Sequence, residues 1–255
     1  MESLHNNYTA LRWMAWSGAA MIVGVFVGLL IAGFLPPPSP DASPAEIAAL
    51  FRDDTTRIRI GAVIMMLTWT LWVTFGAAVS LMIRRLEPDL PVASYASLAL
   101  AGGSYVINLL IALTWAVAAF RPNELGDDVL IAMNDFAWFL VVFTVVPFIL
   151  WMVLIASATL RDKSARPIYP RWMAYFTLWS ALLLFPALMI PFFKNGPFAW
   201  NGLLAFWLPL VVFGVWYFVL VVQTARAITY EQRHPVSVAV PPDSSSSPER
   251  PAISV

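Results

Sequence analysis

The chain has 255 residues, of which 60% are hydrophobic and 12% charged, and its formal net charge is zero. Its mean hydropathy of +0.75 lies outside the range of soluble domains, so we expect an integral membrane protein. A net charge of zero gives no indication of a nucleic-acid partner. The absence of cysteine excludes disulfides, thiolate metal sites and cysteine nucleophiles. Because His5 and His234 both lie in polar ends, we expect no haem, copper or di-iron site, no other metal and no cofactor.

The first element expected is a polar N-terminal segment, 1–12, followed by a membrane span over 13–35. The apolar part is too long for a cleaved signal peptide, whose core has about 7–15 residues. A proline-rich stretch then ends the helix. Ser43, Pro44 and Glu46 follow as a capping serine, a proline at the first helical position and a glutamate that closes a capping box. They predict a short helix that lies on the membrane surface or packs over the mouth of the bundle.

Five more apolar stretches are long enough to cross a hydrocarbon core of about 30 Å as helices that rise ~1.5 Å per residue. Their expected limits are 57–83, 92–120, 129–160, 172–193 and 203–228. We expect prolines to bend the last three, at Pro147, at Pro186 and Pro191, and at Pro209.

The predicted fold class is therefore an all-α integral membrane protein. It is a six-transmembrane-helix bundle over 13–230, with a short extracytoplasmic helix after the first span. The Pro- and Ser-rich segment 231–255 lacks the apolar content to fold, so we expect a disordered cytoplasmic C-terminal tail.

An even number of spans places both termini on one side of the membrane. Ten of the fifteen Lys and Arg residues lie on that side, and the positive-inside rule therefore favours cytoplasmic termini. We expect a multi-pass protein of the cell (inner) membrane, with the lipid bilayer as its main partner.

Asp135 is the only charged residue in 129–160. It lies roughly 9 Å inside the membrane if the span begins at its first residue, and an unpaired carboxylate there costs several kcal/mol. One interpretation is a structural ion pair with Arg59 or Lys194, which lie at the outer ends of other spans. The other is an acid that lines a cavity, where it anchors a ligand or acts as a general acid.

Other polar and aromatic side chains in the spans offer a possible pocket. Hydrogen bonds between helices and contact with lipid are their ordinary roles. The alternative is a ligand pocket lined by aromatic groups and a few polar ones. The candidate ligand-binding residues are Asn108, Asn134, Asp135, Trp138, Trp115 and Trp69.

Three functions are compatible with these features. The favoured one is the binding or transport of a lipophilic small molecule in an outward-facing aromatic and polar pocket, anchored by Asp135 with Asn108 and Asn134. The second is an intramembrane enzyme that acts on a lipid or terpenoid, with Asp135 as general acid. The third is an accessory or structural subunit of a membrane complex, in which Asp135 is only paired.

Overall fold

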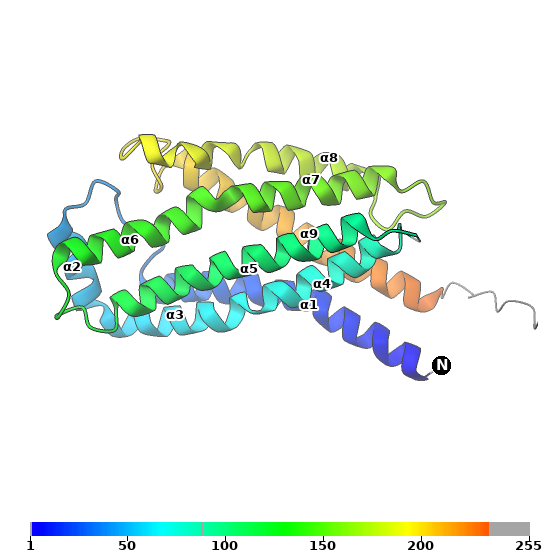
Figure 1. Ribbon diagram of the computed structural model, residues 1–255, viewed down its shortest axis with the longest axis horizontal. Helices are drawn as coiled ribbons and strands as arrows, with labels where there is room; N and C mark the ends of the chain where they lie inside the picture. Colours follow the sequence, from blue (N-terminus) through cyan, green and yellow to red (C-terminus); the bar gives the residue numbers. More distant parts are fainter. Residues whose placement is uncertain (1, 88, 235–255) are drawn as a thin grey trace, which may run out of the picture.

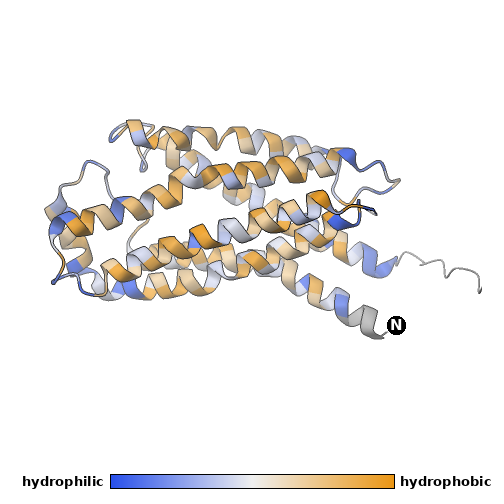
Figure 2. Cartoon of the chain, viewed as in Figure 1, coloured by the Kyte–Doolittle hydropathy of each residue, from blue (hydrophilic) through white to orange (hydrophobic). Residues whose placement is uncertain are grey.

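A computed structural model describes residues 2–87 and 89–234. Within these ranges the chain forms helices and no strand. Six helical segments are long and apolar enough to cross a membrane, and Figure 2 shows apolar residues along their lengths with polar residues at both ends of the bundle. The predicted six-span fold of a multi-pass membrane protein is confirmed. The candidate spans are Asn7–Ala32, Thr55–Arg84, Val92–Ala118, Asp127–Arg161, Arg171–Phe192 and Leu203–Arg233.

The elements follow in chain order along the bundle. The first half contains α1 (Glu2–Ala32), α2 (Pro44–Asp53), α3 (Thr55–Trp69), α4 (Leu71–Arg84) and α5 (Val92–Ala118). The second half contains α6 (Asp127–Val142), the 3₁₀-helix η1 (Phe143–Val145), α7 (Val146–Arg161), α8 (Arg171–Leu182), the 3₁₀-helix η2 (Phe185–Phe192), the π-helix η3 (Leu203–Trp207) and α9 (Leu208–Arg233). In Figure 1, α2 lies at one end of the bundle and both ends of the described chain lie at the other. We call these the α2 end and the terminal end.

Three boundaries differ by three residues or more from those expected. The polar segment 1–12 is helical from Glu2 and continuous with α1, since neither proline nor glycine interrupts it and each added residue gains a hydrogen bond. The first span ends at Ala32 and not at 35, because Gly33, with φ of 74°, ends the helix before the prolines do; glycine adopts this φ without steric cost. At the other end, α9 continues to Arg233, so the expected tail 231–255 begins inside a helix. From 235 onward that tail lies outside the described residues.

The expected capping box at the start of α2 is confirmed. The hydroxyl of Ser43 accepts a hydrogen bond from the backbone N–H of Glu46 at 3.3 Å, and the carboxylate of Glu46 accepts one from the backbone N–H of Ser43 at 2.7 Å. Ile47, Ala48 and Phe51 of α2 are buried. Because α2 buries this side, it packs over the end of the bundle (Figure 1).

Polar contacts hold the loops of the α2 end together. Arg52 of α2 forms an ion pair with Asp127 at 2.7 Å and donates a hydrogen bond to the carbonyl of Leu125 at 3.2 Å. The indole N–H of Trp200 donates to the carbonyl of Pro38 at 2.9 Å. The loop before α6 is therefore joined to α2, and the loop before η3 is joined to the loop before α2.

The second span is interrupted at Thr70, between α3 and α4. The hydroxyl of Thr68 donates to the carbonyl of Ile64 at 2.8 Å, and that of Thr70 donates to the carbonyl of Met66 at 3.0 Å. Such bonds to the preceding turn bend helices. The sequence did not predict this interruption, because the segment contains no proline.

Prolines interrupt the last three spans, as predicted. In the fourth span, Thr144 leaves the helical region with ψ of 35°, shortly before Pro147 in the first turn of α7. The fifth span continues beyond α8 as η2, which contains Pro186 and Pro191. The sixth begins as η3 and becomes α9 next to Pro209. Each proline lacks the backbone donor that a continuous helix requires.

Candidate functional site

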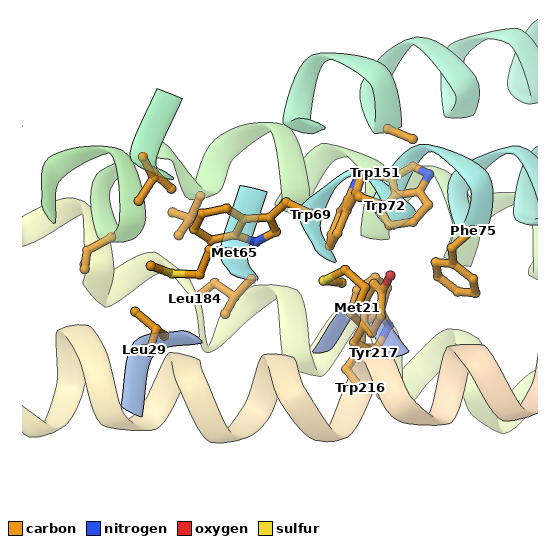
Figure 3. Packing of buried hydrophobic residues seen from close by; sticks show 14 of the residues in the cluster. Met21, Leu29, Met65, Trp69, Trp72, Phe75, Trp151, Leu184, Trp216 and Tyr217 are labelled. Carbon is orange, nitrogen blue, oxygen red and sulfur yellow. The ribbon is translucent and has the colours of Figure 1, made fainter. Parts of the chain in front are cut away.

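A cavity of about 190 Å³ lies inside the bundle, lined by residues of all six candidate spans. Every interruption contributes a lining residue or has one beside it: Trp69, Val145, Ala187 and Ala205. The bent and unwound helices diverge around this space, which explains why side chains leave it unfilled. Figure 3 labels the lining side chains of Met21, Leu29, Trp69, Trp72 and Leu184.

The lining is almost wholly apolar. Apart from the indole N–H groups of Trp69 and Trp72, its only polar side chain is the carboxamide of Asn108. Asn108 is buried and forms no side-chain hydrogen bond with another described residue. Its carboxamide is not among the fully covered unpaired polar groups and it lines the cavity, so Asn108 is available to a polar group there.

Aromatic side chains close the cavity toward the α2 end. The ring of Phe34 lies 4.4 Å from that of Trp115 and 6.2 Å from that of Trp138, measured between centroids. Trp138 also contacts Phe206 at 5.9 Å, and Phe34 contacts Phe51 of α2 at 6.1 Å. All of these residues are buried. We call these five residues the α2-side aromatic layer.

A second set of buried aromatic residues closes the cavity toward the terminal end (Figure 3). Trp72 packs against Tyr217 at 5.1 Å and against Trp151 at 5.5 Å, and Phe75 packs against Tyr217 at 4.9 Å. Trp151 in turn contacts Trp216 at 6.0 Å. These five residues form the terminal-side aromatic layer.

The structure distributes the predicted pocket residues among different places. Trp69 and Asn108 line the cavity. Trp115 and Trp138 lie in the α2-side aromatic layer, where their indole N–H groups are buried without a hydrogen-bond partner. The single aromatic and polar pocket expected from the sequence is therefore divided, and its aromatic part separates the cavity from the α2 end.

Asn134 and Asp135 lie outside the cavity lining. The amide nitrogen of Asn134 donates to the carboxylate of Asp135 at 3.3 Å, while the Oδ1 of Asn134 is buried without a partner. No ion pair joins Asp135 to another described residue. Arg59 donates to the carbonyls at the end of α5, those of Ala119 at 2.8 Å and Phe120 at 2.7 Å.

Neither Arg59 nor Lys194 lies within salt-bridge distance of Asp135, although the positive charge of Lys194 acts on its carboxylate from a longer distance. The last carbonyls of a helix lack intrahelical partners, and they engage the guanidinium of Arg59 instead. Lys194 is exposed in the loop after η2 and has no ion pair within the described ranges.

The lining residues that the sequence analysis missed are apolar. In a membrane helix, apolar side chains face lipid, other helices and cavities alike, so no composition signal distinguishes them. The useful signal was the position of the prolines that interrupt the last three spans. The lining residues that were not predicted include Ile22, Val25, Phe26, Leu210, Phe213 and Gly214.

The fold and the cavity define a six-span helical membrane protein with an apolar internal cavity. No family model matches the chain, and no curated protein or solved structure matches it. Its function is therefore inferred from the cavity.

Proposed function

We propose that this membrane protein binds a lipophilic molecule whose hydrocarbon part occupies the central cavity. The observation that supports this is an apolar space of about 190 Å³ shared by six spans. An engineered apolar cavity of about 150 Å³ stays dry and binds benzene, so a space of this size accepts an apolar group of at least that bulk. Each Å² of apolar ligand surface buried there contributes about 25 cal/mol.

The polar content of the cavity favours a neutral ligand. Asn108 offers one donor and one acceptor group to a hydroxyl or carbonyl, and the lining contains no ionisable side chain. A charged group would remain unpaired there, at a cost of several kcal/mol. The same composition favours binding over catalysis, since a bound molecule would meet neither a general acid nor a general base.

Gly214 provides a way to fill the cavity without a clash. It lies in the lining, and a Cβ atom added to it would meet nothing within 4 Å. Gly102 is a matched control, because a Cβ atom there also meets nothing within 4 Å and Gly102 is outside the lining. Replacing either glycine by leucine removes a similar helix penalty of about 1 kcal/mol.

The test is thermal unfolding in detergent with and without 1-dodecanol. We expect the alcohol to raise the Tm of the wild type and of Gly102→Leu, since a ligand at about 100 times its Kd stabilises a protein by about 2.7 kcal/mol. We expect a much smaller shift for Gly214→Leu, because its side chain occupies the cavity or blocks its opening. Equal shifts in all three proteins would mean that the alcohol acts on the micelle, and the proposed function would be wrong.

A further inference from the structure

The cavity has no route to water at the α2 end. Phe34, Trp115 and Trp138 are each 0% exposed, and they lie between the cavity and α2. Beyond them, α2 and the hydrogen bond between Trp200 and Pro38 cover the end of the bundle. A water-borne ligand would have to displace this packing.

The terminal end is closed as well. Trp151, Trp216 and Tyr217 are each 0% exposed. The indoles of Trp151 and Trp216 are fixed by hydrogen bonds to Ser97 at 2.8 Å and Thr177 at 3.0 Å. The terminal-side aromatic layer is therefore held by both packing and polar contacts.

The remaining side of the cavity lies between α1 and α9. The two helices touch at Gly18 and Val221, where an added Cβ atom would be 2.8 Å from the valine side chain. On the α2 side of this contact, residues of both helices line the cavity instead. Eight lining residues are partly exposed, and six of them belong to these two helices: Ile22, Val25, Phe26, Leu210, Phe213 and Gly214. Figure 1 shows α9 running obliquely across the bundle, in accord with this divergence.

This opening lies at the depth of the lipid chains. Phe26 is six residues from Ala32 at the end of its span, and Leu210 is seven residues after Leu203 at the start of its span. Both positions are roughly 10 Å inside the membrane at ~1.5 Å per residue, within a hydrocarbon core of about 30 Å. Asn108 is ten residues from Ala118, which places it roughly 15 Å deep, near the midplane.

We propose that the ligand is a neutral lipid without a charged headgroup, such as a long-chain alcohol or ketone, which enters sideways from the bilayer between α1 and α9. This inference rests on the proposed binding function and names the ligand class and its route. A phospholipid headgroup must stay at the membrane surface, whereas the opening and Asn108 both lie in the hydrocarbon region. A small polar group on a hydrocarbon chain reaches Asn108 with the whole molecule inside the core.

Photolabelling in liposomes tests the ligand class. One probe is a long-chain alcohol that carries a diazirine on its chain, and the other is phosphatidylcholine with the same diazirine chain. We expect the alcohol to label Ile111, Val142 and Leu184, which line the cavity and are buried, with competition by 1-dodecanol. We expect phosphatidylcholine to label only lipid-facing positions such as Val23, which is 61% exposed. Comparable labelling of the cavity by phosphatidylcholine overturns the neutral-lipid class but leaves the binding function standing. No cavity labelling by either probe overturns both.

Nitroxide accessibility tests the route. Because the chain has no cysteine, single-cysteine variants can be labelled specifically. We expect a nitroxide at Phe26→Cys to relax more with oxygen, which partitions into lipid, than with a water-soluble nickel chelate. Val23→Cys and Asp41→Cys serve as references for lipid and for water, since both side chains are exposed. A profile at Phe26 like that at Asp41 would show access from water and overturn the lateral route, whatever the alcohol binding shows.

Discussion

Gly18 of α1 lies against Val221 of α9 so closely that an added Cβ atom would be 2.8 Å from the valine Cγ2. The same atom would be 2.9 Å from the ring of Phe75. Small residues let membrane helices approach in this way. This contact fixes the distance between α1 and α9 on the terminal side of the cavity.

Gly18→Ala is expected to destabilise the protein. Overpacking costs about 1–3 kcal/mol, which exceeds the helix gain of about 1 kcal/mol that alanine brings over glycine. Gly102→Ala gives the same gain in helix propensity, and its added Cβ atom meets nothing within 4 Å. This variant is therefore expected to be neutral or stabilising. Chemical unfolding in detergent measures both. Equal stability of the two variants would contradict the close contact.

Asn108→Leu is expected to remove the polar selectivity of the cavity. The wild type should bind 1-dodecanol more tightly than dodecane, by about 5- to 10-fold, which corresponds to one buried hydrogen bond of roughly 1 kcal/mol. The variant should bind the two molecules equally and be at least as stable as the wild type without ligand. Binding is measured by the concentration dependence of Tm. An alcohol preference that persists in the variant would assign the polar contact to another residue.

Asp135→Asn is expected to leave the stability unchanged or to raise it at neutral pH. Asp135 is partly buried and has no ion pair with a described residue. Breaking a buried ion pair typically costs about 3–5 kcal/mol, so a loss of that size in chemical unfolding would show that Asp135 is paired. Asp127→Asn is the comparison, because it removes the partner of Arg52 and is expected to loosen α2.

Glu87→Gln is expected to reduce the acid sensitivity of the fold. The carboxylate of Glu87 accepts hydrogen bonds from the backbone N–H groups of Ala93 at 2.7 Å and Ser94 at 2.9 Å, at the start of α5. Burial raises the pKa of this carboxyl, but the two amides and the charge of Arg84 outweigh it, and the pKa lies below its ordinary value of 4.5. Such a group stabilises the folded state above that value and loses its contribution as the pH falls through the folded pKa.

The measurement is the difference in free energy of unfolding between the wild type and Glu87→Gln from pH 7 to pH 3. We expect the wild type to be more stable by about 1 kcal/mol at neutral pH, as for the loss of a helix cap, and the difference to shrink below pH ~5. The other carboxyl groups are the same in both proteins, so their contributions to the free energy of unfolding cancel in this difference. A gap that stays constant with pH would show that Glu87 does not act through its charge.

The spans could be predicted because membrane-crossing length is encoded in consecutive apolar residues. The start of α2 could also be predicted, because it depends on hydrogen bonds between Ser43 and Glu46, which lie within one turn of each other. The break at Thr70 was not predicted, because threonine bonds to its own helix with or without a bend.

The site was less accessible to sequence reasoning. Asn134 and Asp135 point in directions about 100° apart around α6, and only the packing of neighbouring helices decides which direction faces a cavity. Asn134 is buried and Asp135 is partly exposed. Neither residue lines the cavity. Asn108 was identified because an amide in the middle of a span is energetically costly in lipid. This cost does not depend on how the helix is rotated about its axis.

The contact between Gly18 and Val221 also constrains how the bundle is assembled. These positions are roughly 200 residues apart, so at ~5–20 residues per second the ribosome needs on the order of 10–40 s to deliver the second after the first. During that interval α1 lies in the bilayer without α9 beside it. The wall of the cavity is complete only when α9, the last helix of the described residues, has been inserted.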